Sequence, residues 1–317
     1  MSEQREAILN TAKIQLKTLR EKYPHLMQHV ANTTSLYSTP IIYPSRYTID
    51  AKPPFCSSGT FTFIGQRFGV LTNHHVAKFV VREHPNYIYV PLPWPKTGFL
   101  PLQISQIISL PTEQREGIDM AFIELSPAAP ACVFQQLNKQ FWYLDASFAD
   151  HMQGKLCVES QSLHNYLWLT HGNSFSGREL KKDGDNVYWD HPHAAPYFLG
   201  PRSVETIAYR YPSLSQLFYV DEVLCFVDKE MSRDAMPGSF EGMSGAGVWR
   251  IEFGPDLQVQ FNLAGLATAE GHGRDSEVDK IFFHGTVALY RYFYPFCLGG
   301  FSRKRNASIT SGIEFKF

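Results

Sequence analysis

Residues 241–249 of the chain read EGMSGAGVW, a glycine-rich turn that carries one serine and leads into an apolar stretch. Gly242 and Gly245 flank Ser244 and allow the backbone to turn tightly there. Such a turn can direct successive backbone N–H groups at one point, where they bind an anion. The stretch therefore predicts a serine nucleophile, with the N–H groups of Gly242 and Ser244 as an oxyanion hole, or else an ordinary turn before a strand.

A serine hydroxyl becomes a strong nucleophile when a histidine takes its proton and a carboxylate holds that histidine in the right tautomer. Two further segments could supply these groups. Residues 69–76, GVLTNHHV, run from an apolar strand into polar residues and place His75 at the strand end. Residues 117–125, GIDMAFIEL, place Asp119 directly before an alternating strand. Taken alone, the first segment is also compatible with a structural histidine pair, and the second with a turn aspartate.

Together the three segments resemble the trypsin-like (chymotrypsin-fold) serine proteases. Residues 72–76 are similar to the Thr-x-x-His stretch of that family, and residues 119–121 to its Asp-apolar-Ala. Residues 242–245 are similar to its Gly-x-Ser-Gly, and the three motifs follow one another in the family's order. The resemblance covers roughly residues 55–295 and is to the bacterial-type intracellular members of the family.

The resemblance assigns a role to each of these residues. It implies that Ser244 attacks a peptide carbonyl, that His75 is the general base and that Asp119 orients His75. The N–H groups of Gly242 and Ser244 would stabilise the oxyanion. This chemistry requires neither a metal nor an organic cofactor. The predicted activity is that of a serine endopeptidase that acts on a protein or peptide substrate through an acyl-enzyme.

Residues 259–268 are similar to the strand that lines the primary specificity pocket of the family. The resemblance therefore implies that Gly265, Leu266 and Ala267 line this pocket. Just beyond, Glu270 is either a selector for a basic substrate side chain or a loop carboxylate.

The serine turn departs from the family pattern at two positions. Met243 stands where the family has an Asp or Asn, and Ala246 where it usually has a Gly. Neither change removes a catalytic group, but both leave room for an inactive arrangement of the turn. Three alternatives follow: an active endopeptidase, a latent one that an activating partner protein switches on, and a catalytically inactive module of the same fold that binds peptides.

After Pro40 the chain consists of short β-rich runs between Gly, Pro, Asn and Asp residues, a pattern typical of a barrel or sandwich. With the resemblance, this pattern predicts an all-β protein of two packed six-stranded antiparallel β-barrels, chymotrypsin-like, with an N-terminal helical arm. The expected parts are a helical arm and linker over residues 1–50, a first barrel with His75 and Asp119 over 51–130, a second barrel with Ser244 over 131–300 and a tail over 301–317.

Local patterns predict the individual elements. Residues 3–30 have a helical periodicity that Pro24 should end or kink. Residues 150–215 have no clear period, and we expect a long loop insertion there with a short helix near residues 203–209. The expected strands lie at residues 60–64, 69–72, 87–90, 102–110, 120–125, 218–227, 247–253, 259–268 and 281–289.

The bulk composition limits the partners. The formal net charge of the 317 residues is −1, so neither nucleic acid nor a membrane surface is an expected partner. The 5 cysteines are odd in number and form no CxxC pair, which is typical of a reduced, cytoplasmic chain. Residues 1–10 lack the apolar core of a secretory signal, and no apolar run approaches the roughly 18 residues of a membrane span.

Two other chemistries are weaker. An α/β-hydrolase would need a glycine at position 246, where the chain has Ala246. Asp256 followed by His272 or His284 could supply its acid and histidine, but no alternation of strands and helices precedes Ser244. Residues 189–193, WDHPH, together with His164 and His171, could bind a metal, but a polar loop explains them as well.

Overall fold

A computed structural model describes the parts of the chain that carry the fold. The described residues are 18, 21–43, 55–93, 98–110, 118–153, 166–173, 180–183, 186–189, 194–211, 216–227, 242–253, 258–272 and 279–299. The predicted tail over 301–317 and nearly all of the helical pattern before residue 21 lie outside the described residues.

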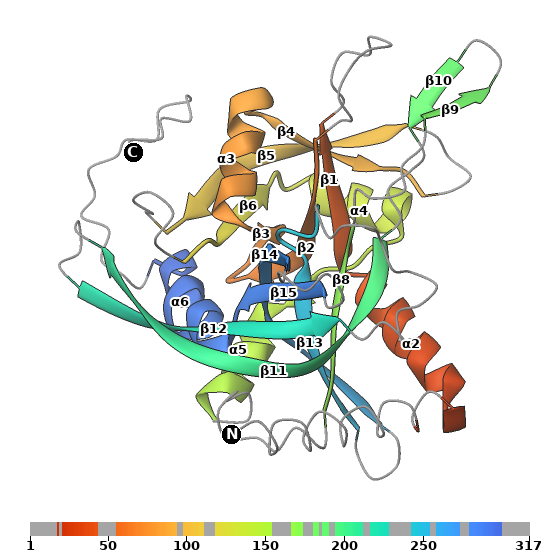
Figure 1. Ribbon diagram of the computed structural model, residues 1–317. Coiled ribbons are helices and arrows are strands. Elements are labelled where there is room, and N and C mark those ends of the chain that lie inside the picture. Colours follow the sequence, from red (N-terminus) through yellow and green to blue (C-terminus); the bar gives the residue numbers. More distant parts are fainter. Residues whose placement is uncertain are drawn as a thin grey trace.

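The second half of the chain forms a closed six-stranded barrel. Every neighbouring pair of its strands is antiparallel. Two long strands form the curved ribbons across the front of Figure 1. In the order of their pairing, the barrel strands are β11 (Ala194–Tyr211), β12 (Gln216–Val227), β15 (Asp279–His284), β14 (Val259–His272), β13 (Gly247–Phe253) and β8 (Tyr166–Asn173). A separate hairpin, β9 (Leu180–Asp183) and β10 (Asn186–Trp189), projects from the upper edge in Figure 1.

The first half forms a sheet that curls back on itself. Its first strand, β1 (Ser38–Tyr43), pairs along its whole length with β2 (Phe55–Ile64). It meets β4 (Tyr87–Pro91) at the single pair Ile42↔Tyr89, which closes the curl. A short strand, β7 (Trp142–Tyr143), joins β2 in parallel. The strands of the curl, in the order of their pairing, are β1 (Ser38–Tyr43), β4 (Tyr87–Pro91), β5 (Phe99–Ser109), β6 (Ala121–Leu125), β3 (Arg67–Thr72) and β2 (Phe55–Ile64). The predicted all-β, double-barrel fold is therefore confirmed.

Local sequence explains the β2–β3 hairpin that leads to the predicted histidine. Gly65 and Gln66 both have positive φ, 50° and 70°. Two such residues in a two-residue loop give a turn whose twist matches that of the flanking strands. The turn thereby sets the register in which Thr60 faces Leu71 and β3 ends at Thr72.

Three predictions about elements are wrong. The first barrel begins at β1, inside the stretch expected to be arm and linker, because residues 38–43 pair with β2. Residues 150–215 are not mainly loop, since they supply β8 and β11 of the second barrel, and β11 runs through the expected helix at 203–209. The last predicted strand stops at His284, and the chain continues as a π-helical segment, η2 (Val287–Phe293).

Helices cover the outside of the two barrels (Figure 1). The predicted break at Pro24 is real, but a further helix, α2 (Pro24–Ser35), starts there because proline suits a first helical turn. The other helices are α3 (His74–Glu83), α4 (Ala129–Leu137), α5 (Leu144–Met152) and α6 (Tyr294–Cys297). Within the described residues, no helix is both long enough and apolar enough to cross a membrane.

Three buried apolar clusters hold the fold together. One fills the first barrel and receives Val76 and Val80 of α3 and Val133 of α4, so α4 belongs to the first barrel rather than to the second. Another fills the second barrel. The largest lies between the barrels and joins residues of both with α2 and η2. Burial of apolar surface is the main favourable term in folding, so the central cluster fixes how the two halves meet.

Candidate active site

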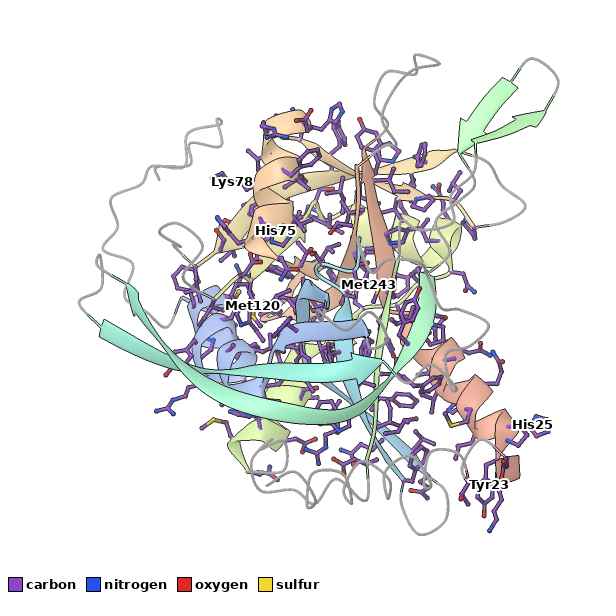
Figure 2. The ribbon with its side chains drawn as sticks, in the orientation of Figure 1. Tyr23, His25, His75, Lys78, Met120 and Met243 are labelled. Atoms are coloured by element: carbon purple, nitrogen blue, oxygen red, sulfur yellow. The ribbon has the colours of Figure 1, made fainter. Side chains whose placement is uncertain are left out.

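The predicted base lies where the first barrel passes into a helix. β3 ends at Thr72, Asn73 occupies the N-cap position of α3, and His75 is the second residue of that helix. The buried side of α3, with Val76 and Val80, anchors it on the barrel. The His75 side chain is therefore left 51% exposed. Figure 2 shows His75 at the end of α3 that lies toward the middle of the molecule.

Asp119 contacts His75 through both carboxylate oxygens. The Oδ2 atom lies 2.6 Å from His75 Nδ1, and Oδ1 accepts from the His75 backbone N–H at 3.1 Å. Asn73 Nδ2 also donates to the Asp119 carbonyl at 2.7 Å. An ionised carboxylate only accepts hydrogen bonds, so in the neutral ring the proton lies on Nδ1 and the lone pair on Nε2. This is the tautomer in which a histidine can accept a proton from a serine.

The charge state of Asp119 favours this arrangement. Burial acts to raise the pKa of its carboxyl, but the hydrogen bonds and the charge of His75 outweigh burial and lower the pKa below its ordinary value of 3.8. The carboxylate is therefore ionised at neutral pH. Burial has the opposite effect on the neighbouring His74 and lowers its pKa. The His74 ring forms no hydrogen bond with the acid within the described residues.

The serine turn has a tightly constrained backbone. Gly242 and Gly245 have φ values of 95° and 86°, a region that favours glycine. The Gly245 N–H donates to Ala267 O at 2.9 Å, and the Ala246 N–H donates to Met243 O at 2.8 Å. A β-carbon on Gly245 would overlap the Thr72 hydroxyl and the Ser58 carbonyl, so the turn lies directly against the end of β3.

Two serines of β2 bind the same turn from the first barrel. Ser57 Oγ and the Ser58 N–H both donate to Ser244 O, at 2.7 and 3.0 Å. Ser58 Oγ donates to Gly242 O at 2.8 Å. Thr72 Oγ1 donates in turn to Ser58 O at 2.8 Å, which ties the turn to β3 as well. The sequence around Ser57 and Ser58 does not predict that they bind the serine turn, because that turn lies almost 190 residues away.

The two predicted oxyanion donors, the N–H groups of Gly242 and Ser244, donate no hydrogen bond in the part of the chain that the structure describes. The bond from Ala246 to Met243 O fixes the peptide that carries the Ser244 N–H, and the bond from Ser58 fixes the carbonyl of Gly242. Both donors can therefore bind a ligand oxygen without breaking an existing bond.

The hydroxyl of Ser244 lies against β14. Its Oγ donates to Thr268 O at a long 3.4 Å, and among the described residues it forms no hydrogen bond with His75. Rotation about χ1 of Ser244 is enough to move the hydroxyl away from this weak partner. Hydrogen bonds of this kind are often long in proteins without bound substrate and tighten when substrate binds.

The departures from the family pattern have a packing role. Met243, labelled in Figure 2, and Ala246 are 3% and 0% exposed and belong to the apolar cluster of the second barrel. A β-carbon on Gly172 would press against both of them, so the three positions fit one another. The serine turn is thus anchored through an apolar side chain, where a carboxylate would be buried among apolar neighbours.

The three residues expected at a specificity pocket lie in β14 beside the turn. Leu266 and Ala267 are buried, in the central cluster and the second-barrel cluster respectively. Gly265 lies against the backbone of His284, where a β-carbon would overlap the carbonyl oxygen. Their backbone contacts the serine turn, as Ala267 O accepts from Gly245. Their role as pocket residues stays a prediction, and the side chain of Glu270 lies outside the described residues.

The described residues contain no group of three or more His, Cys, Asp or Glu side chains placed to hold a metal ion. His171, considered above as a metal ligand, is buried and its Nδ1 lies 3.2 Å from Thr34 Oγ1 of α2. His164, His191 and His193 lie outside the described residues.

Comparison with known proteins does not assign the chain to a family. No protein-family model matches the chain, and no curated protein matches it. Among solved structures, a thermostable serine protease named AL20, from an extremophilic microorganism, is similar over 82% of this chain and 96% of its own. The identity is 11% and the TM-score 0.40, a likeness too low to say anything about the activity of this chain.

Proposed function

We propose that the chain is a serine endopeptidase in which Ser244 is the nucleophile, His75 the general base and Asp119 the residue that orients the base. One observation carries the proposal: Asp119 contacts His75 at two points and selects the tautomer with a free Nε2. The turn around Ser244, whose Gly242 and Ser244 N–H groups donate no hydrogen bond within the described residues, lies against the end of β3, the strand that leads to His75.

The proposed reaction uses these groups in sequence. The Ser244 hydroxyl turns from Thr268 O to His75 Nε2 and transfers its proton as Oγ attacks the carbonyl carbon of a peptide. The developing oxyanion receives hydrogen bonds from the Gly242 and Ser244 N–H groups. His75 then protonates the leaving amine, the C–N bond breaks, and an acyl-enzyme on Ser244 remains.

Hydrolysis of the acyl-enzyme completes the cycle. A water molecule gives its proton to His75 Nε2 and attacks the ester, and the same two N–H groups stabilise the second oxyanion. The imidazolium then returns its proton to Ser244 Oγ as the bond from Oγ to the acyl carbon breaks and the carboxylic acid product leaves. The ionised Asp119 stabilises the positive charge that His75 carries between these steps, which its lowered pKa permits.

A fluorophosphonate probe tests the proposal because it labels only an activated serine. The folded wild-type protein should be labelled at Ser244, as shown by mass spectrometry of the labelled peptide. Ser244→Ala and His75→Ala should lose labelling, and Asp119→Asn should lower its rate by about 10⁴-fold because the wrong tautomer is favoured. His74→Ala is the matched control, since it removes the adjacent imidazole and should retain labelling.

Two outcomes would contradict the proposal in different ways. Labelling that survives His75→Ala would show that His75 does not activate the serine. A folded wild-type protein that is never labelled, even with a candidate activating partner, but binds peptides would favour the inactive peptide-binding module. The free oxyanion donors and the ionised Asp119 weigh against that module, because peptide binding alone requires neither.

A further inference from the structure

A buried histidine of the second barrel contacts the acid of the first. His284 is the last residue of β15 and is 2% exposed. Its Nε2 lies 3.0 Å from the backbone nitrogen of Asp119, whose N–H donates to it. No sequence motif indicates this contact, because 165 residues separate the two positions.

The contact defines the state of the His284 ring. A backbone N–H only donates, so Nε2 must carry a lone pair and the proton of the neutral ring lies on Nδ1. Burial lowers the pKa of His284 to about 4, although the nearby charge of Asp119 opposes the shift. Within the described residues, Nδ1 is buried and has no hydrogen-bond partner. A buried N–H without a partner destabilises the folded state, so stability alone does not explain why a histidine occupies this position.

His284 completes a set of contacts that fix Asp119 from three sides. His284 accepts from its N–H, Asn73 donates to its carbonyl at 2.7 Å, and His75 contacts its carboxylate. With its N–H and its carbonyl both bonded, the backbone of Asp119 has a fixed position from which the side chain reaches His75. The backbone of the acid is thereby held independently of His75.

The same histidine connects the acid to the barrel that carries the serine. In the β14–β15 pairing His284 faces Leu266, and two residues further along β14 Thr268 accepts from Ser244 Oγ. Gly265 allows this close approach of β14 and β15, because a β-carbon there would overlap the His284 carbonyl. Gly265, expected at a specificity pocket, is thus required for the position of His284.

We propose that His284 is a positioning residue of the hydrolytic site: as a neutral hydrogen-bond acceptor it holds the Asp119 backbone, and through it His75, in register with the serine turn of the other barrel. This inference rests on the proposed function for its catalytic consequence. The contact on which it depends is between two barrels, and it can be measured without any activity.

Three variants test the proposal by the rate of fluorophosphonate labelling. His284→Leu keeps a similar volume but removes the acceptor, and a misplaced acid should slow labelling by up to about 10²-fold. His284→Gln carries an amide oxygen near the former Nε2 and should recover most of the rate. His151→Leu is the matched control, because it removes a partly buried imidazole of α5 that stacks on Tyr290 and does not contact the acid.

Histidine-selective ¹⁵N labelling gives a second measurement that needs no turnover. The proton in the short His75–Asp119 hydrogen bond should resonate far downfield in the wild type, in His284→Gln and in His151→Leu. In His284→Leu it should shift or be lost to exchange with water. If His284→Leu does not fold, His284→Asn serves instead, since its shorter side chain cannot reach Asp119 and the same change is expected.

The outcomes separate this inference from the proposed function. An unlabelled wild type contradicts the proposed function, and the downfield proton alone then decides the role of His284. Wild-type labelling rates together with an unchanged downfield proton in His284→Leu would overturn the inference. A slow rate in both His284→Leu and His284→Gln would overturn it as well, because the acceptor would then not be what matters.

Discussion

At the scale of single residues, the serine turn depends on a position that cannot hold a side chain. Gly245 has a φ of 86°, and a β-carbon would overlap Thr72 Oγ1 and Ser58 O. Neither atom can easily move, because the two are hydrogen-bonded to each other. A second glycine, Gly98, has a φ of 103°, but a β-carbon there would meet no atom of the described residues within 4 Å. A comparison of alanine substitutions at Gly245 and Gly98 therefore separates the effect of backbone strain from the effect of steric overlap.

We predict that Gly245→Ala abolishes fluorophosphonate labelling, whereas Gly98→Ala retains it. Both substitutions place an alanine at positive φ, which costs about 1–3 kcal/mol. Only Gly245→Ala must also displace the turn that carries Ser244. Urea unfolding and the labelling rate measure the two effects separately. Equal labelling of both variants would show that the overlap relaxes without moving the serine.

At the scale of elements, β2 supports the serine turn through two hydroxyls with unequal roles. Ser57 Oγ shares its acceptor, Ser244 O, with the Ser58 N–H, so its loss leaves that carbonyl bonded. Ser58 Oγ is the donor to Gly242 O, next to an oxyanion donor. The strand itself holds its place through pairing with β1 and β3.

We therefore predict that Ser58→Ala slows labelling more than Ser57→Ala does. Each substitution removes a hydrogen bond worth about 1 kcal/mol, so the thermal stabilities of the two variants should be similar. The difference should appear in the labelling rate, because only Ser58 fixes the orientation of Gly242. The reverse order of rates would mean that the Gly242 carbonyl needs no support.

At the scale of the whole molecule, the burial of His284 where the two barrels meet makes stability depend on pH. His284 has a folded-state pKa of about 4 against an ordinary value of 6.5, so the unfolded chain binds a proton in this window and the folded chain does not. The contribution of His284 to the free energy of unfolding is complete above pH 6.5 and is lost as the pH falls toward 4. The full shift corresponds to about 3 kcal/mol. The lowered pKa of Asp119 acts in the same direction, but only below its ordinary value of 3.8.

We predict that the free energy of unfolding of the wild type decreases between pH 6.5 and 4 and that His284→Gln flattens this decrease. Glutamine does not titrate, so the variant loses the contribution of His284 and keeps those of His74 and His151, whose pKa values are also lowered by burial. Urea unfolding at a series of pH values measures the slope. A slope unchanged by the substitution would contradict a buried, neutral His284.

Much of the fold and of the site could be predicted because the signals are local. Strands β2 to β6 follow short apolar alternations, and the β2–β3 turn needs residues that accept positive φ. Gly242, Ser244 and Gly245 lie within four consecutive residues, and β3 ends three residues before His75. The predictions failed for β1, β8 and β11, where the barrel pairing selects an extended backbone that no local period marks.

The sequence by itself determined the two-barrel class and the residues proposed as nucleophile, base and acid. Only the tertiary structure decided that Asp119 contacts His75 at two points, that Ser57 and Ser58 bind the serine turn, and that His284 holds Asp119. The physical reason is the range of each interaction. Turn geometry and strand periodicity act between neighbours in sequence, whereas these hydrogen bonds exist only after burial of the central apolar cluster brings distant segments together.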